Sequence, residues 1–270
     1  MPTGTDPRAT LRASVERTSA LLSLITDGQQ PVLGCNWTAG EVGAHLVVTL
    51  QTYADAAGNS FDRISPYIAK TGNFRERLSF LTEGTLKLVS ERDPWALSRL
   101  LVRAAAAFLD SISERDHAVS IRAPWYGPHV RLSEELALSL LIGEQLVHGH
   151  DLAITIGHPW PISNDDASHV IPIVIAMIPF LNNNVASADR IRYGIRLVDG
   201  HHFDIVFDDG AVEVATPAAT ADVELALSPA DFVLAIYGRH SLQTLAAGGR
   251  LRSLGGRQGR IDLQDRLVSP

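Results

Sequence analysis

The sequence has little cysteine and no excess of positive charge. Its 270 residues include one cysteine, Cys35, which excludes an intramolecular disulfide. The 23 basic residues are outnumbered by 30 acidic residues, and the net charge of −7 argues against a nucleic-acid partner and against adhesion to an anionic membrane surface. The first residues lack the basic and apolar regions of a signal peptide. We therefore expect small-molecule partners and a cytoplasmic location.

Lysine and long apolar runs are also scarce. Only Lys70 and Lys87 are lysines, and this bias, together with abundant Ala and Leu, resembles proteins coded by high-GC genomes and favours an actinobacterial source. The apolar segment 164–181 is interrupted by Pro172 and Pro179 and is too short to span a bilayer. With 46% apolar residues the chain is able to fill a core, so a globular protein with one large or two ordinary domains is predicted.

The strongest functional signal lies in a predicted helix over residues 136–156. Glu144 and His148 are four residues apart, so a carboxylate and an imidazole share one helix face. That face is otherwise mostly apolar, which predicts burial, and a buried carboxylate is costly unless it is paired or bound to a metal. The spacing alone also fits a chance pair on a solvated face or a core Glu–His pair, because two ligands do not make a metal site.

A third candidate ligand comes from an earlier helix. Residues 37–41 open this helix with a capping box, in which Thr38 caps the first turn and Glu41 reaches back. His45 follows one turn later, inside an apolar stripe. A lone histidine there is more often a core residue than a ligand, but with Glu144 and His148 it completes a His/Glu/His set that suits Zn²⁺ and related divalent ions.

The chain divides into a helical region and a later α+β region. Besides the two helices above, the apolar periodicity predicts helices over residues 10–25, 74–90, 94–113 and 164–181, and a structured loop over residues 116–131.

From about residue 186 the pattern changes to strand alternation. Strands are predicted over residues 192–198, 202–207, 211–215 and 221–227, followed by a helix that Ser228 caps. The turns Asp199-Gly200 and Asp209-Gly210 join the first three strands. The predicted domains are therefore residues 1–185 and 186–270.

Two segments of the first region together resemble the mycothiol-dependent maleylpyruvate isomerase family. They are residues 37–46, Trp-Thr-Ala-Gly-Glu-Val-Gly-Ala-His-Leu, and residues 143–153, Gly-Glu-Gln-Leu-Val-His-Gly-His-Asp-Leu-Ala. Segments 195–200, 222–228, 237–239 and 248–251 look like the sterol-carrier-protein-like domain of the same family. The resemblance implies a mixed α and α+β chain, with a DinB-like metal-binding four-helix bundle followed by a smaller α+β sterol-carrier-like domain.

The resemblance also implies a chemistry. The family binds a divalent metal, usually taken as zinc, through residues that match His45, Glu144 and His148, and it uses mycothiol as cofactor or co-substrate. Three protein ligands leave a coordination position open, and a metal there holds a thiol as thiolate near neutral pH. We therefore expect an S-transferase or a cis–trans isomerase that acts on a small electrophile.

Several residues outside the ligand set are further candidates. Arg239 is the expected catalytic and cofactor-binding residue because a guanidinium suits carboxylates, although most arginines of this region are better explained by surface solvation. Trp125 and Tyr126 could overhang a cofactor site or simply pack against the bundle. Cys35 is expected to be an inert thiol.

Two neighbours of the ligand pair are separated by helix geometry. Asp151 is placed to support a ligand histidine, either His148 or His45, from behind. His150 points away from Glu144 around the helix and is not expected to be a ligand.

Two functions from different classes fit these patterns. The first is the mycothiol-dependent metalloenzyme. The alternative is a non-catalytic carrier for a small apolar ligand, in which the metal is structural or absent. A cavity continuous from the metal to the interface of the predicted domains would favour the enzyme, and a closed four-ligand metal with a separate apolar tunnel would favour the carrier. The patterns leave open whether the chain is a monomer or a homodimer.

Overall fold

The computed structural model describes residues 5–113, 120–183, 190–254 and 262–270. The chain folds into two compact units, Met1–Pro161 and Ile162–Pro270. The first is helical and the second contains a sheet, so the predicted fold class is confirmed. No helix among the described residues is long and apolar enough to cross a membrane.

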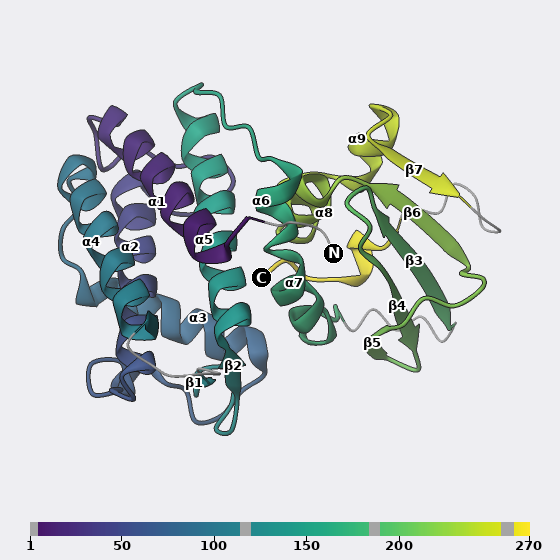
Figure 1. Cartoon of the computed structure of the whole chain (residues 1–270), viewed down its shortest axis with the longest axis horizontal. Helices are drawn as coiled ribbons and strands as arrows, with labels where there is room; N and C mark the ends of the chain where they lie inside the picture. The colour runs from purple at the N-terminus through teal and green to yellow at the C-terminus, as the bar shows by residue number, and fades with distance from the viewer. Residues whose placement is uncertain (1–4, 114–119, 184–189, 255–261) are drawn as a thin grey trace. The chain divides into compact units, whose positions relative to one another are not determined.

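Four long helices form the bundle of the first unit (Figure 1). Helix α1 packs against α4 and α5, and α2 packs against the same two helices. The elements of this unit are α1 (Pro7–Leu24), α2 (Ala39–Ala57), η1 (Ser65–Tyr67), α3 (Phe74–Thr85), η2 (Leu86–Leu88), α4 (Pro94–Ser113), β1 (Ser120–Arg122), β2 (Arg131–Ser133) and α5 (Glu134–Thr155).

Helices α2, α3 and α4 begin where the sequence predicted, whereas α1 begins at Pro7 and α5 at Glu134, a few residues before the predicted starts at 10 and 136. Asp93 accepts a hydrogen bond from the Ala96 amide at 2.7 Å ahead of α4, and Ser133 accepts one from Leu136 at 3.2 Å at the start of α5. The predicted loop over 116–131 differs from the structure, because strands β1 and β2 form an antiparallel hairpin within and just beyond it. Residues 114–119 of that segment lie outside the described part of the chain.

A five-stranded sheet in the order β5-β4-β3-β6-β7 forms the second unit (Figure 1). Strands β3 and β6 are parallel and the other neighbours are antiparallel. The elements are α6 (Asn164–Ser168), α7 (Ile171–Met177), η3 (Ile178–Phe180), β3 (Ile191–Leu197), β4 (His202–Asp208), β5 (Ala211–Ala215), β6 (Val223–Leu227), α8 (Pro229–Ile236), α9 (Leu242–Ala247), β7 (Leu251–Leu254) and η4 (Gln264–Arg266).

The predicted strands and the helix capped by Ser228 are confirmed, whereas the single helix over 164–181 is wrong. The segment is divided into α6, which ends at Ser168, and then α7 and η3. Pro172 and Pro179 lie in the first turns of α7 and η3, where each lacks the backbone N–H that a continuous helix would need. The compact units also divide at 161/162 rather than at 185/186, since α6 and α7 pack against α8. The predicted junction at 185/186 itself lies outside the described residues.

Candidate metal centre

Helices α2 and α5 bring three potential ligands together. The capping box at the start of α2 is formed, with the Thr38 amide donating to Glu41 Oε2 at 2.9 Å and the Glu41 amide donating to Thr38 Oγ1 at 3.3 Å. This fixes where α2 begins and therefore which face carries His45, one turn further on. Glu144 and His148 follow each other on one face of α5, as their spacing predicted.

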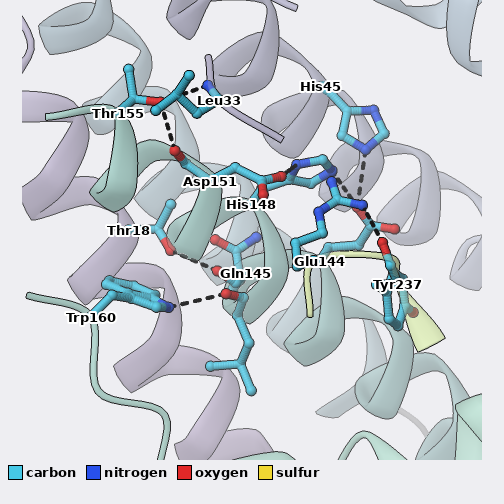
Figure 2. A network of polar contacts seen from close by, with 12 residues as sticks. Thr18, Leu33, His45, Glu144, Gln145, His148, Asp151, Thr155, Trp160 and Tyr237 are labelled. Carbon is cyan, nitrogen blue, oxygen red and sulfur yellow. Dashed lines mark hydrogen bonds and ion pairs between the residues drawn. The ribbon is translucent and has the colours of Figure 1, made fainter. Parts of the chain in front are cut away.

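The three side chains converge on one point. The Oε2 atom of Glu144 lies 3.0 Å from His45 Nε2 and 3.5 Å from His148 Nε2. One donor atom from each residue lies within 4.8 Å of the other two. Figure 2 shows His45 reaching the Glu144 carboxylate from α2 while His148 approaches it along α5.

The cluster is largely shielded from water. His45 and His148 are each 9% exposed, and the Glu144 side chain is 21% exposed. Two imidazoles and a carboxylate that meet in such a place are typical ligands of Zn²⁺ and related divalent ions, which take nitrogen and oxygen donors at about 2.0–2.2 Å. Small side-chain movements toward a common centre would bring all three donors to that distance, so the residues fit the metal that the resemblance implies.

A buried carboxylate supports one ligand from behind. Asp151 is 0% exposed, and its Oδ2 lies 3.2 Å from His148 Nδ1 (Figure 2). With the hydrogen of the imidazole on Nδ1, the Nε2 lone pair is left for a metal ion at the point where the three donors meet. A carboxylate in this position orients a ligand histidine and makes it a stronger base. Of the two alternatives that the sequence left open, Asp151 therefore contacts His148.

The other ligand histidine has no such support within the part of the chain described. His45 Nδ1 is buried and has no hydrogen-bond partner there. Instead, the ring of Trp37 lies over both imidazoles, with ring centroids 4.8 Å from His45 and 5.7 Å from His148. Sequence reasoning missed this contact, because the only signal was the place of Trp37 directly before the Thr38 cap. Trp37 covers one side of the cluster with an apolar surface.

Trp125 and Tyr126 lie in the loop between β1 and β2, in the same unit as the cluster. Trp125 is 1% exposed and meets the ring of Tyr53 edge-on at 5.4 Å. Tyr126 stacks on Phe74 at 5.6 Å, and its hydroxyl lies 3.2 Å from the hydroxyl of Tyr53. Burial, and secondly the charge of Glu144, raises the pKa of Tyr126 to about 12. The phenol therefore stays neutral, and a role of both loop residues in cofactor binding stays a prediction.

The remaining candidates are not among the three clustered donors. Arg239 belongs to the second unit, where it is half-buried and donates from Nη1 to the carbonyl of Tyr237 at 2.6 Å. His150 is half-buried on α5 and is not among the three clustered donors. Cys35 is partly exposed in the loop before α2 and is also outside that set.

Comparison with known proteins supports the fold. Residues 183–256 match the SCP-2 sterol transfer family. Two crystal structures of the mycothiol-dependent maleylpyruvate isomerase resemble nearly the whole chain. A histidine-to-alanine mutant has a TM-score of 0.56 and 13% identity, and the second structure has a TM-score of 0.54 and 14% identity. Each alignment covers 92% of this chain and 91% of the other.

A search of curated proteins found no significant sequence match. At 13–14% identity the structural likeness establishes the fold. The resemblance inferred from the sequence is therefore confirmed in the arrangement that it implied, a helical unit followed by a sterol-carrier-like one.

Proposed function

We propose that the chain is a metal-dependent enzyme that uses mycothiol, as cofactor or co-substrate, to attack a small electrophile as an S-transferase or cis–trans isomerase. The observation that carries this proposal is the convergence of His45, Glu144 and His148 on one point. The fold shared with the mycothiol-dependent isomerase supports the choice of thiol.

The ligand residues give the site its chemistry. His45, Glu144 and His148 would hold a divalent ion, with Zn²⁺ the expected one. The ion would supply a positive charge that keeps a bound thiol ionised near neutral pH. One carboxylate and two neutral imidazoles leave the ion with a net positive charge, which favours an anionic sulfur. Asp151 holds His148 in the tautomer that presents Nε2, and Trp37 keeps water from one side of both imidazoles.

Three residues are proposed to act on the organic reactants. Arg239 suits a carboxylate of the substrate or the thiol cofactor, because its guanidinium donates two parallel hydrogen bonds. Trp125 and Tyr126 are the proposed cofactor-binding aromatics, and the contact of the Tyr126 hydroxyl with Tyr53 is one polar feature of that loop.

Metal content tests the ligand set. Protein prepared without chelator should contain about one divalent ion per chain by elemental analysis, and the variants His45→Ala and His148→Ala should lose most of it. His150→Ala is the matched control, because it removes a histidine from the same helix α5 outside the cluster. Full occupancy in both ligand variants would refute the assignment.

Cobalt substitution tests the thiol. Sulfur bound to Co²⁺ should produce an intense near-ultraviolet charge-transfer band when mycothiol is added, which nitrogen and oxygen ligands do not produce. The His150→Ala protein should show the same band. Absence of the band in wild-type protein with cobalt confirmed in place would remove the thiol from the mechanism.

A second candidate function is supported by the SCP-2 family match over residues 183–256. In this function the second unit carries a small apolar ligand, and the metal is structural or absent. A chelator-treated protein that binds a fluorescent fatty acid as tightly as the metal-loaded protein, and gives no cobalt–thiol band, would favour this carrier over the enzyme.

A further inference from the structure

Two tyrosine hydroxyls meet between helix α2 and the loop that joins β1 to β2. The hydroxyl of Tyr53 lies 3.2 Å from that of Tyr126, which is the distance of a hydrogen bond. The ring of Trp125 lies 5.4 Å from Tyr53 and 5.9 Å from Tyr126. Tyr53 is 2% exposed and Trp125 is 1% exposed, so the two hydroxyls meet in an apolar setting.

The hydroxyl pair has one hydrogen more than it can use internally. Two phenols carry two hydrogens, and a single bond between them uses one. Within the residues that the structure describes, neither hydroxyl donates to a further acceptor. Trp125 adds a third donor, because a hydrogen bond from its indole lowers the pKa of both phenols. A buried group with surplus donors is stabilised by an external oxygen that accepts the remaining hydrogen.

The pair lies within electrostatic reach of the candidate metal centre. Burial is the main cause that raises the pKa of both phenols, and the charge of the Glu144 carboxylate raises both further. Tyr53 also follows His45 by eight residues on α2, about 12 Å along the axis. Side chains of a helix lean toward its N-terminus, so the long Tyr53 side chain extends from its own turn toward that of His45.

Neighbouring residues hold the two hydroxyls in place. Tyr126 stacks on Phe74 of α3 with ring planes 14° apart, and its backbone carbonyl accepts a hydrogen bond from Arg77 Nη2 at 2.9 Å. Tyr53 meets Phe108 of α4 edge-on at 6.5 Å. Such support fixes a donor in advance of the reaction, which is what makes hydrogen bonds effective in stabilising a developing charge.

We propose that Tyr126 donates a hydrogen bond to the carbonyl oxygen of the electrophile and that Tyr53 positions it by donating to the Tyr126 oxygen. This inference rests on the proposed function. The sulfur of the thiolate forms a bond to the β-carbon of an unsaturated carbonyl compound, and the alkene electrons move to the carbonyl oxygen to give an enolate. The enolate then takes a proton from water at its α-carbon, or expels the thiolate after rotation.

The Tyr126 phenol donates in this step without losing its proton. Burial, with the Glu144 charge, raises its pKa to about 12, so the neutral form persists at the pH of the reaction. The hydrogen bond strengthens as negative charge develops on the oxygen, which is the condition for lowering the barrier rather than merely binding the substrate.

Two reactions of the bound thiol separate this role from the metal chemistry. Addition to but-3-en-2-one places charge on a carbonyl oxygen, whereas methylation by iodomethane displaces iodide and involves no oxygen. On the metal-loaded, mycothiol-saturated protein, Tyr126→Phe should slow the addition about 100-fold and should slow methylation far less, because phenylalanine keeps the ring that is proposed to contact the thiol cofactor. Tyr53→Phe should slow the addition by about tenfold, because Tyr126 keeps its own hydrogen.

Binding provides a readout that does not depend on turnover. By calorimetry, the wild-type protein should bind the S-(3-oxobutyl) derivative of mycothiol about five- to tenfold more tightly than the S-butyl derivative, which lacks the carbonyl. Tyr126→Phe should remove this preference. Tyr67→Phe is the matched control, since Tyr67 is half-buried in η1 of the same unit and its hydroxyl has no described hydrogen bond.

The outcomes are distinct. Equal slowing of addition and methylation, or an unchanged addition rate in Tyr126→Phe with metal content and melting temperature as in wild type, would overturn the assignment. A wild-type protein that accelerates neither reaction of the thiol would overturn the proposed function, and this inference with it.

Discussion

The contact between Asp151 and His148 allows a quantitative test of the metal centre. Replacing Asp151 with asparagine keeps the shape of the side chain and an oxygen that accepts from His148 Nδ1, now 3.2 Å away, but removes the charge. Without that charge the imidazole is a weaker base. Loss of such support costs about 10- to 100-fold in metal affinity. The isosteric change should lie at the low end, with a dissociation constant about tenfold larger, which is about 1.4 kcal/mol of binding free energy.

Competition with a chromogenic chelator at fixed pH measures this loss directly. Thermal unfolding measures it independently, because a metal at 100 times its dissociation constant stabilises the fold by about 2.7 kcal/mol and at ten times by about 1.4 kcal/mol. A chain of this size changes its melting temperature by about 2–4 °C per kcal/mol. The difference in melting temperature between loaded and metal-free protein should therefore be smaller in Asp151→Asn by about 3–5 °C.

The matched control is Asp110→Asn, which makes the same change on the exposed face of α4. It should leave both the dissociation constant and the metal-dependent shift as in wild type. An unchanged metal affinity in Asp151→Asn would refute a supporting role for the buried carboxylate. An equal loss in Asp110→Asn would attribute the effect to net charge instead.

Two further predictions concern stability. The pKa of Tyr126 is raised from 10.0 to about 12, so its stabilising contribution is fully present below pH 10 and is lost as the pH rises to 12. Urea unfolding across this range should lose about 1.4 kcal/mol per pH unit more in wild type than in Tyr126→Phe, and parallel curves would contradict the shift. Separately, a Cβ at Gly149 would lie 2.1 Å from Trp160 Cζ2, so Gly149→Ala should displace the indole that donates to the Leu146 carbonyl at 3.0 Å. We expect a loss of about 1–3 kcal/mol in urea unfolding. A loss no larger than in Gly248→Ala, where the nearest atom to the added Cβ is 3.4 Å away, would contradict the steric reason.

Features with a local cause were predictable from the sequence. Thr38 and Glu41 satisfy each other's backbone amides within one helical turn, so the start of α2 needs no tertiary information. The same holds for the meeting of Glu144 and His148, which the helical repeat alone places on one face. The helical repeat also allows the contact of Asp151 with His148, three residues apart on α5, but the choice between His148 and His45 needed the structure.

The contacts that Trp37 and Tyr126 make from loops were not predictable from the sequence. Trp37 reaches two imidazoles from a segment that precedes a helix, and Tyr126 reaches Tyr53 from the hairpin loop. Their positions depend on packing between segments far apart in the chain. Strands β1 and β2 have three residues each, which is too short to show an alternation of apolar and polar residues. The sequence therefore predicted a loop where the structure forms a hairpin.

The free-energy cost of burying the Asp151 carboxylate helps to choose between the two candidate functions. A fully buried carboxylate beside an imidazole gives little net stability, and apolar residues of similar volume would usually do as well. The next two residues of α5, Leu152 and Ala153, are apolar and fully buried, so the fold could accommodate such a residue here. A charge retained at that position is explained when His148 must be a strongly basic ligand in a fixed tautomer. A structural zinc ion is almost always held by four protein donors, whereas the cluster among the described residues has three. The buried carboxylate and the three donors of the described cluster therefore both support the proposed function, in which an exogenous ligand takes the remaining position of the ion.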